Sequence, residues 1–225
     1  MTAIRILHVD DEPDIREVVE LSLALNPDFE IRSCGSATEA LAIAAEWSPF
    51  IILLDVMMPG MDGPTTLAQL RKNPRTADIP VLFMTARAQA REVERFISLG
   101  AHGVISKPFD PMTLPFLVRG HLQAARMESM RGVFKRRATS DIAQLESCRS
   151  SLVQDASPEA LSRVRAIAHG LAGAAGLFGF ERIGSDAAAL EDVVLANGSP
   201  HDVTRALDHL VAVIKDEWDA PPATA

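Results

Sequence analysis

The sequence predicts two domains of different class, a parallel α/β domain followed by an all-α helical bundle. In the first half, short aliphatic runs alternate with helical patterns, and this order is typical of a parallel sheet. After Asp110 no further strand pattern is found, and helical periodicity continues to Trp218. A length of 225 residues and a hydrophobic content of 48% are enough for two cores.

Four strands are predicted in the first half, at residues 4–9, 50–54, 80–84 and 103–106. Each is short, aliphatic and bounded by turn residues, as expected of strands buried on both faces. Because the carboxyl ends of parallel strands share one edge of the sheet, polar residues at those ends should converge. These residues are Asp10 and Asp11, Asp55, Thr85 and Lys107.

The converging carboxylates predict phosphoryl chemistry with a bound metal ion. Three like charges in one pocket repel unless one is protonated or a hard divalent cation lies among them, and Mg2+ is the natural candidate. We expect Asp10, Asp11 and the backbone carbonyl of Met57 to hold the ion. Asp55, at the end of the central strand, is then the expected nucleophile toward phosphorus.

Two further residues complete this expected site. Thr85 and Lys107 would bind the remaining phosphoryl oxygens and neutralise their charge, as phosphoryl transfer requires. A single acidic residue after a strand is usually a solvated turn. The ordered set of five residues favours a functional site instead.

Four segments carry a family resemblance. They read VDDEP at 9–13, DVMMPGMDG at 55–63, MTA at 84–86 and SKPF at 106–109. Through them, residues 1–125 resemble a response-regulator receiver domain.

The resemblance implies a doubly wound, five-stranded parallel sheet of the flavodoxin-like type. It also implies that Asp55 accepts a phosphoryl group from a phosphohistidine, with Mg2+ on Asp10, Asp11 and Asp55, and that the peptide bond before Pro108 is cis. Receivers often carry a Tyr or Phe three residues before the lysine, where this chain has Val104. We therefore expect no aromatic switch.

Composition limits the function classes. The net charge of −8 argues against broad nucleic-acid binding, and the basic stretch at 131–137 is interpreted as a solvated linker face. Cys34 and Cys148 lack metal-ligand spacing and are expected to be reduced thiols. No apolar run is long enough to span a membrane, and the N-terminus shows no signal-peptide pattern. We expect a soluble, cytoplasmic protein.

The second half predicts a four-helix bundle. A helix is expected to start at Asp110 and Pro111, and the domains are expected at 1–125 and 138–220, with a helical linker at 126–137. Four apolar stripes with short connections then define antiparallel helices. The stripes are Ile142, Leu145, Cys148 and Leu152; Leu161, Val164, Ala168, Leu171, Ala175 and Phe178; Ile183, Ala187, Leu190 and Val194; and Val203, Leu207, Leu210, Ile214 and Trp218.

His169 is the candidate reactive residue of the bundle. Helical spacing places it off the apolar stripe, on a face with Gly173 and Gly176. Glycine costs about 1 kcal/mol inside a helix relative to alanine, so these glycines need a reason, and close approach of a partner is one. A neutral imidazole is a competent nucleophile near neutral pH. An exposed helical His is more often an ordinary surface residue.

The glycine context changes that interpretation. The segment HGLAGAAGLFG at 169–179 resembles the signature of histidine phosphotransfer (HPt) domains, which are four-helix bundles with an exposed reactive His. The family usually carries Lys three residues after the His, where this chain has Ala172. Arg165, one turn before His169, is a candidate substitute for that charge.

Together these patterns predict a two-component phosphorelay protein. Asp55 would accept phosphoryl from a sensor histidine kinase, including a hybrid one, and His169 would exchange phosphoryl with Asp55 or with another response-regulator receiver. The chain shows no ATP-binding motif, so we expect a phosphotransfer intermediate rather than an enzyme. Two alternatives stay open: a receiver-controlled binding module whose HPt bundle is never phosphorylated, and, more remotely, a phosphatase with an aspartyl nucleophile.

Overall fold

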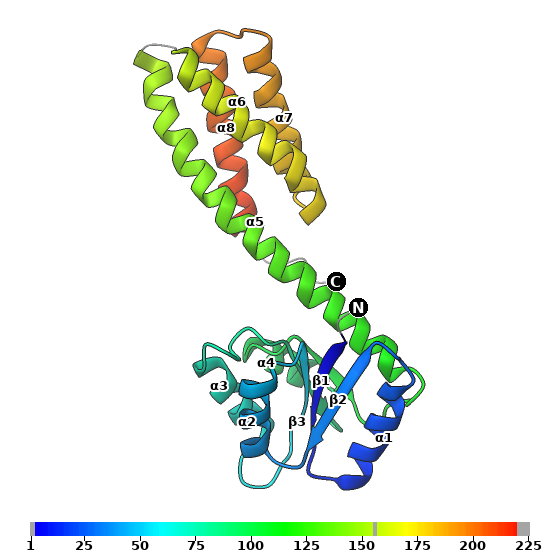
Figure 1. The fold of residues 1–225 in the computed structure, drawn as a ribbon. Coiled ribbons are helices and arrows are strands. Elements are labelled where there is room, and N and C mark those ends of the chain that lie inside the picture. Colours follow the sequence, from blue (N-terminus) through cyan, green and yellow to red (C-terminus); the bar gives the residue numbers. More distant parts are fainter. Residues whose placement is uncertain (1–2, 155–156, 220–225) are drawn as a thin grey trace. The chain divides into compact units, whose positions relative to one another are not determined.

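The computed structural model describes residues 3–154 and 157–219. The chain divides into two compact units between Arg126 and Met127. Within these described residues, the first unit holds all the strands and the second is helical, as predicted (Figure 1).

The first unit is built on a five-stranded parallel sheet with the order β2-β1-β3-β4-β5. This confirms the doubly wound class. The strands are β1 (Ile4–Val9), β2 (Phe29–Cys34), β3 (Ile51–Asp55), β4 (Val81–Thr85) and β5 (Gly103–Ser106).

Helices cover both faces of the sheet because neighbouring strand residues point in opposite directions. Ile6 and Leu53 face α1 (Pro13–Ala24) and the start of α5 (Leu114–Gln154). Leu7 and Leu54 face the opposite layer. That layer consists of α2 (Ala37–Trp47), α3 (Gly63–Lys72) and α4 (Ala90–Ser98).

The structure corrects one helix boundary. The helix expected to start at Asp110 and Pro111 is α5, which begins at Leu114, after a turn in which the backbone N–H of Thr113 donates to the carbonyl of Asp110. Pro115 is thus the second residue of the helix, where its missing N–H costs no helical hydrogen bond.

The second unit contains the later part of α5 together with α6 (Pro158–Ala175), η1 (Gly176–Phe178), α7 (Glu181–Leu195) and α8 (Pro200–Asp219) (Figure 1). Each of the four predicted apolar stripes contributes to its core. The segment 126–137, expected to be a helical linker, is helical as part of α5, and Phe134 within it is buried in this core. Of the helices described, none is long and apolar enough to cross a membrane.

Candidate functional site

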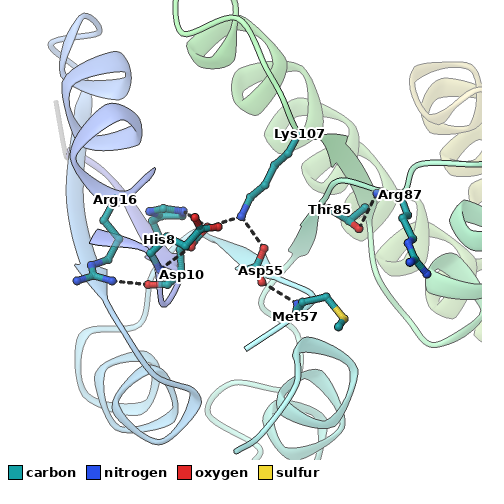
Figure 2. Close-up of polar contacts among 9 residues, drawn as sticks. His8, Asp10, Arg16, Asp55, Met57, Thr85, Arg87 and Lys107 are labelled. Carbon is teal, nitrogen blue, oxygen red and sulfur yellow. Dashed lines mark hydrogen bonds and ion pairs between the residues drawn. The ribbon is translucent and has the colours of Figure 1, made fainter. Parts of the chain in front are cut away.

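Lys107 joins two buried carboxylates at the carboxyl edge of the sheet. Its Nζ donates to Asp10 Oδ2 and to Asp55 Oδ1, both at 2.6 Å (Figure 2). Asp10 follows β1, Asp55 ends β3, and Lys107 follows β5, so three strand ends meet as the parallel topology predicts. The Asp10 side chain is fully buried and that of Asp55 is 8% exposed.

Burial and neighbouring charges set the electrostatics of this cluster. Burial raises the pKa of Asp55, and the Asp10 carboxylate acts in the same direction, whereas the hydrogen bond from Lys107 opposes both. For Lys107, burial disfavours the ammonium, but its hydrogen bonds to Asp10 and Asp55 outweigh this and raise its pKa. Lys107 therefore stays charged beside two carboxylates, and the cluster retains an excess of negative charge.

Local backbone geometry fixes the Asp55 side chain. The Met57 N–H donates to Asp55 Oδ2 at 2.7 Å, which holds the carboxylate against the loop after β3. Gly63 begins α3 directly over this loop. A Cβ at Gly63 would lie 2.5 Å from the Asp55 carbonyl oxygen, so only glycine lets α3 start this close to the strand end.

The residues present fit Mg2+. Asp10 and Asp55 supply hard carboxylate oxygens, and their uncompensated charge would be relieved by a divalent cation. No three acidic, histidine or cysteine side chains among the described residues are arranged to hold a metal ion. The ligand set would thus depend on the Met57 carbonyl and on water, several molecules of which Mg2+ usually keeps.

Two of the expected residues lie outside the hydrogen-bonded cluster. Thr85 is buried at the end of β4, and its Oγ1 accepts from the Arg87 N–H at 3.1 Å (Figure 2). Asp11 follows Asp10 and is partly exposed.

Two features of β5 and the loop after it bear on the family resemblance. Val104 packs on the face of the sheet that α2, α3 and α4 cover. The peptide bond between Lys107 and Pro108 is cis, as the resemblance implied.

Two residues beside this cluster were not predicted to belong to the site. Arg16 on α1 donates from Nη1 to the Asp10 carbonyl oxygen at 2.6 Å. His8 is fully buried, with Nε2 3.9 Å from Asp10 Oδ2 and no hydrogen-bond partner within the described part of the chain. Burial lowers the pKa of His8 to about 4, so this imidazole is neutral at pH 7.

The bundle presents a second, very different site. The His169 side chain on α6 is 77% exposed, and its Nδ1 lies 3.1 Å from Glu191 Oε2 on α7. Arg165 Nε lies 3.8 Å from the other oxygen of the same carboxylate. The spacing placed His169 and Arg165 on one exposed face, whereas no motif in the sequence indicated Glu191.

Comparisons with known protein families identify a domain in each half of the chain. The family model for the response regulator receiver domain matches residues 6–119, and the Hpt domain model matches residues 129–220. The chain belongs to the response regulator receiver family and carries an Hpt domain after the receiver. These two domains are the modules of two-component phosphorelays.

Curated relatives match the receiver half. Response regulator Rre1 of Synechocystis sp. is 36% identical over 129 residues, which are 57% of this chain and 56% of that protein. Regulatory protein AtoC of Escherichia coli is also 36% identical over 129 residues, but these are only 27% of its length. The chain thus spans about half or less of the curated relatives it matches.

Solved structures support the fold of the same half. A putative response regulator from Chloroflexus aurantiacus superimposes with a TM-score of 0.50 at 31% identity, covering 54% of this chain and 99% of that one. Chemotaxis response regulator CheY4 of Vibrio cholerae gives a TM-score of 0.50 at 29% identity, with the same coverage.

Proposed function

We propose that this chain is a phosphorelay intermediate in which Asp55 and His169 both carry phosphoryl groups. The observation that supports this most is the Lys107 ammonium on the Asp55 and Asp10 carboxylates, in a chain that also carries an exposed histidine in an Hpt bundle. The proposed partners are a sensor histidine kinase and a receiver, which is either this one or that of another protein.

In the first step, an Asp55 carboxylate oxygen forms a bond to phosphorus, and the N–P bond of the donor phosphohistidine breaks. The electron pair leaves with the imidazole nitrogen, so no net oxidation or reduction occurs. The Lys107 ammonium, already at hydrogen-bond distance from Asp55, is placed to neutralise charge on the phosphoryl oxygens. Thr85, at the end of the adjacent strand, is proposed to bind another of these oxygens.

Asp10, Asp11 and Asp55, with the Met57 carbonyl, would hold Mg2+, which supplies further neutralisation of phosphoryl charge when bound. Asp10 is buried, and Arg16 donates a hydrogen bond to its backbone carbonyl oxygen. Protein groups rather than water therefore fix the position of Asp10. The low exposure of Asp55 restricts water, which would otherwise hydrolyse the acyl phosphate.

In the second step, His169 exchanges phosphoryl with a receiver aspartate. Its exposure lets another protein reach the imidazole ring. Helix α6 and the adjoining η1 offer little steric bulk there, because a Cβ at Gly173 or Gly176 would meet no atom within 4 Å. We further propose that the phosphoryl group comes from a partner and not directly from ATP.

Radiolabel transfer to the full chain tests both steps. A phosphorylated histidine kinase should label the His169→Gln variant on Asp55, giving a base-labile acyl phosphate. A panel of phosphorylated receivers should label the Asp55→Asn variant on His169, giving acid-labile, base-stable label. The double variant is the control for both, and labelled ATP alone should give no incorporation.

The same experiment separates the alternatives. Label on Asp55 without any on His169, across the whole panel of receivers, would favour a binding module controlled by its receiver. Steady turnover of a small phosphate ester without transfer to protein would favour the phosphatase.

A further inference from the structure

Arg137 of α5 reaches across to α6 at the residue that follows His169. A Cβ added at Gly170 would lie 3.1 Å from Arg137 Nη2, which is tighter than an ordinary van der Waals contact. The guanidinium therefore lies close to the backbone of α6, in space that a larger residue would occupy. This contact gives Gly170 a physical reason in the middle of a helix, where glycine is otherwise unfavourable.

The guanidinium of Arg137 has hydrogen-bond donors to spare. Its side chain is 63% exposed, and its Nε lies 3.8 Å from Oδ2 of Asp141, one turn further along α5. Within the described residues this ion pair is accompanied by no hydrogen bond from Arg137. The planar guanidinium can thus offer two parallel N–H groups to an anion, and this geometry matches a phosphoryl group.

Arg137 and Arg165 lie on different sides of His169. Consecutive helical residues point about 100° apart, so Gly170 lies toward α5, where it meets Arg137. Arg165 lies toward α7, where its Nε faces Glu191. A group attached to the exposed imidazole would therefore have a guanidinium on each side.

The phosphorylated histidine needs such positive charge. A phosphoryl group carries about two negative charges near neutral pH and has three acceptor oxygens. The position three residues after His169, where the family usually has Lys, is Ala172 and supplies none of that charge.

We infer that Arg137 binds the phosphoryl group carried by His169, and that Gly170 keeps the space in which its guanidinium lies. This inference rests on the proposed function of His169. It adds to the site a residue of α5, which neither helical spacing nor the family resemblance connected with the histidine.

The transfer step then involves Arg137 without changing its protonation. A ring nitrogen of His169 forms a bond to phosphorus, the P–O bond of the partner's aspartyl phosphate breaks, and the electron pair leaves with the aspartate carboxylate. Arg137 stays protonated and donates to the phosphoryl oxygens. Because the free imidazole offers it no such oxygens, Arg137 favours the phosphorylated state of His169.

Solvent limits the size of this effect. Water and salt screen the charge of a guanidinium that is mostly exposed. We therefore expect removal of Arg137 to slow phosphorylation of His169 by about fivefold at low salt, and by less as salt is added.

Phosphoramidate as a small donor tests the inference without a protein partner. In the full chain with Asp55→Asn, a ring nitrogen of His169 displaces ammonia from phosphorus. Arg137→Ala should slow this reaction about fivefold, and Arg137→Lys, which keeps the charge but not the planar fork, should recover part of the loss. Arg136→Ala is the matched control, because Arg136 is exposed and points away from the core side of α5 that holds Phe134. It should leave the rate unchanged.

Phosphorus NMR of the phosphorylated chain provides a readout that a merely structural role would not move. A guanidinium in contact with the phosphoryl group favours its more negative form and so lowers its pKa. Arg137→Ala should raise the pKa of this phosphoryl group by about half a unit, and Arg136→Ala should not change it.

A double-mutant cycle tests the role of Gly170. Gly170→Leu fills the space of the guanidinium and should slow the phosphoramidate reaction although Arg137 is present. In the Arg137→Ala background the same substitution should cause little further loss. Equal losses in both backgrounds would mean that the leucine obstructs His169 directly, and would overturn the role of Gly170.

Three results bear on Arg137 and on the proposed function separately. An unchanged phosphoramidate rate together with an unchanged phosphoryl pKa in Arg137→Ala would overturn the inference. Slower labelling from a phosphorylated receiver alone would also overturn it, because Arg137 would then contact the partner protein. No phosphorylation of His169 in the wild type by phosphoramidate or by any receiver would refute the proposed function itself.

Discussion

The Asp55 side chain is 8% exposed and accepts hydrogen bonds from Met57 and Lys107, whereas the His169 side chain is 77% exposed and, within the described residues, pairs with Glu191 of the neighbouring helix. Both are proposed to carry the same phosphoryl group. The receiver site concentrates charge inside a folded sheet and needs compensating partners. The proposed bundle site places its nucleophile on an accessible helix face among exposed partners, so we expect stability and function to be coupled in the first domain and nearly independent in the second.

The largest change in stability is expected when the positive charge that compensates Asp55 is removed. Lys107→Met leaves Asp10 and Asp55 buried without their ammonium partner, which should cost the receiver roughly 3–5 kcal/mol in the absence of Mg2+. His169→Gln, which changes an exposed side chain, should alter stability by less than about 0.5 kcal/mol. Amide exchange followed by mass spectrometry reports β3 and α6 separately in the full chain.

Added Mg2+ provides the internal control for the comparison of Lys107→Met with His169→Gln. Added Mg2+ should restore part of the lost protection of β3 in Lys107→Met, because a bound cation replaces the missing positive charge. Equal destabilisation by the two variants would contradict the proposed difference between the sites.

The next effect concerns pH and again separates the two domains. Burial lowers the pKa of His8 from 6.5 to about 4. Between these two pH values, His8 is mostly protonated in the unfolded chain and mostly neutral in the folded receiver. The receiver should therefore lose stability mainly as the pH falls from 6.5 to about 4, by about 3 kcal/mol in total, because only the unfolded chain binds this proton over that interval. Protection of β1, corrected for intrinsic exchange, measures the loss.

His8→Leu isolates this contribution, because the variant has no imidazole to protonate. Its β1 protection should depend less on pH over the same interval. The same slope in wild type and variant would mean that other groups, and not His8, cause the acid sensitivity.

A smaller effect is expected at Gly173, on the face of α6 that carries His169 and little side-chain bulk. Gly173→Ala should stabilise the bundle by about 1 kcal/mol, because alanine favours helix and its Cβ meets no atom within 4 Å. If a partner approaches this face, the same methyl group should slow labelling of His169. Gly132→Ala is the matched control: it lies in α5, where its Cβ would meet only the end of the Arg136 side chain, at 3.7 Å. It should stabilise without slowing transfer.

The sequence predicted four of the five strands of the receiver sheet directly. β1, β3, β4 and β5 are short apolar runs that end at or just before a polar residue, so both the strand and its polar end can be recognised. β2 was not identified individually, because Glu30 and Arg32 are exposed at this sheet edge and interrupt the apolar run in FEIRSC. The family resemblance, and not periodicity, supplied the fifth strand.

In the bundle, the sequence predicted features within one helix but not the contacts between helices. Its apolar stripes predicted the core, and the glycines indicated His169, because both are patterns within one helix. Glu191 follows His169 by 22 positions and lies on another helix, so only the packing of α6 against α7 brings the two together. Likewise, Arg16 contacts Asp10 through a backbone carbonyl, which no side-chain motif reveals.

The smallest expected effect concerns Arg165, which we proposed as the substitute for the lysine missing at Ala172. Its guanidinium is 54% exposed and already faces Glu191, so Arg165→Ala should change bundle stability by less than about 1 kcal/mol. Transfer to His169 should slow by about threefold at low salt, and the difference should shrink as salt screens the charge. Arg163→Ala removes the same charge from an exposed position of α6 that makes no ion pair within the described residues, and it should leave the rate unchanged. Equal transfer rates for wild type and Arg165→Ala at low salt would contradict the proposed role of Arg165 as the substitute for that lysine.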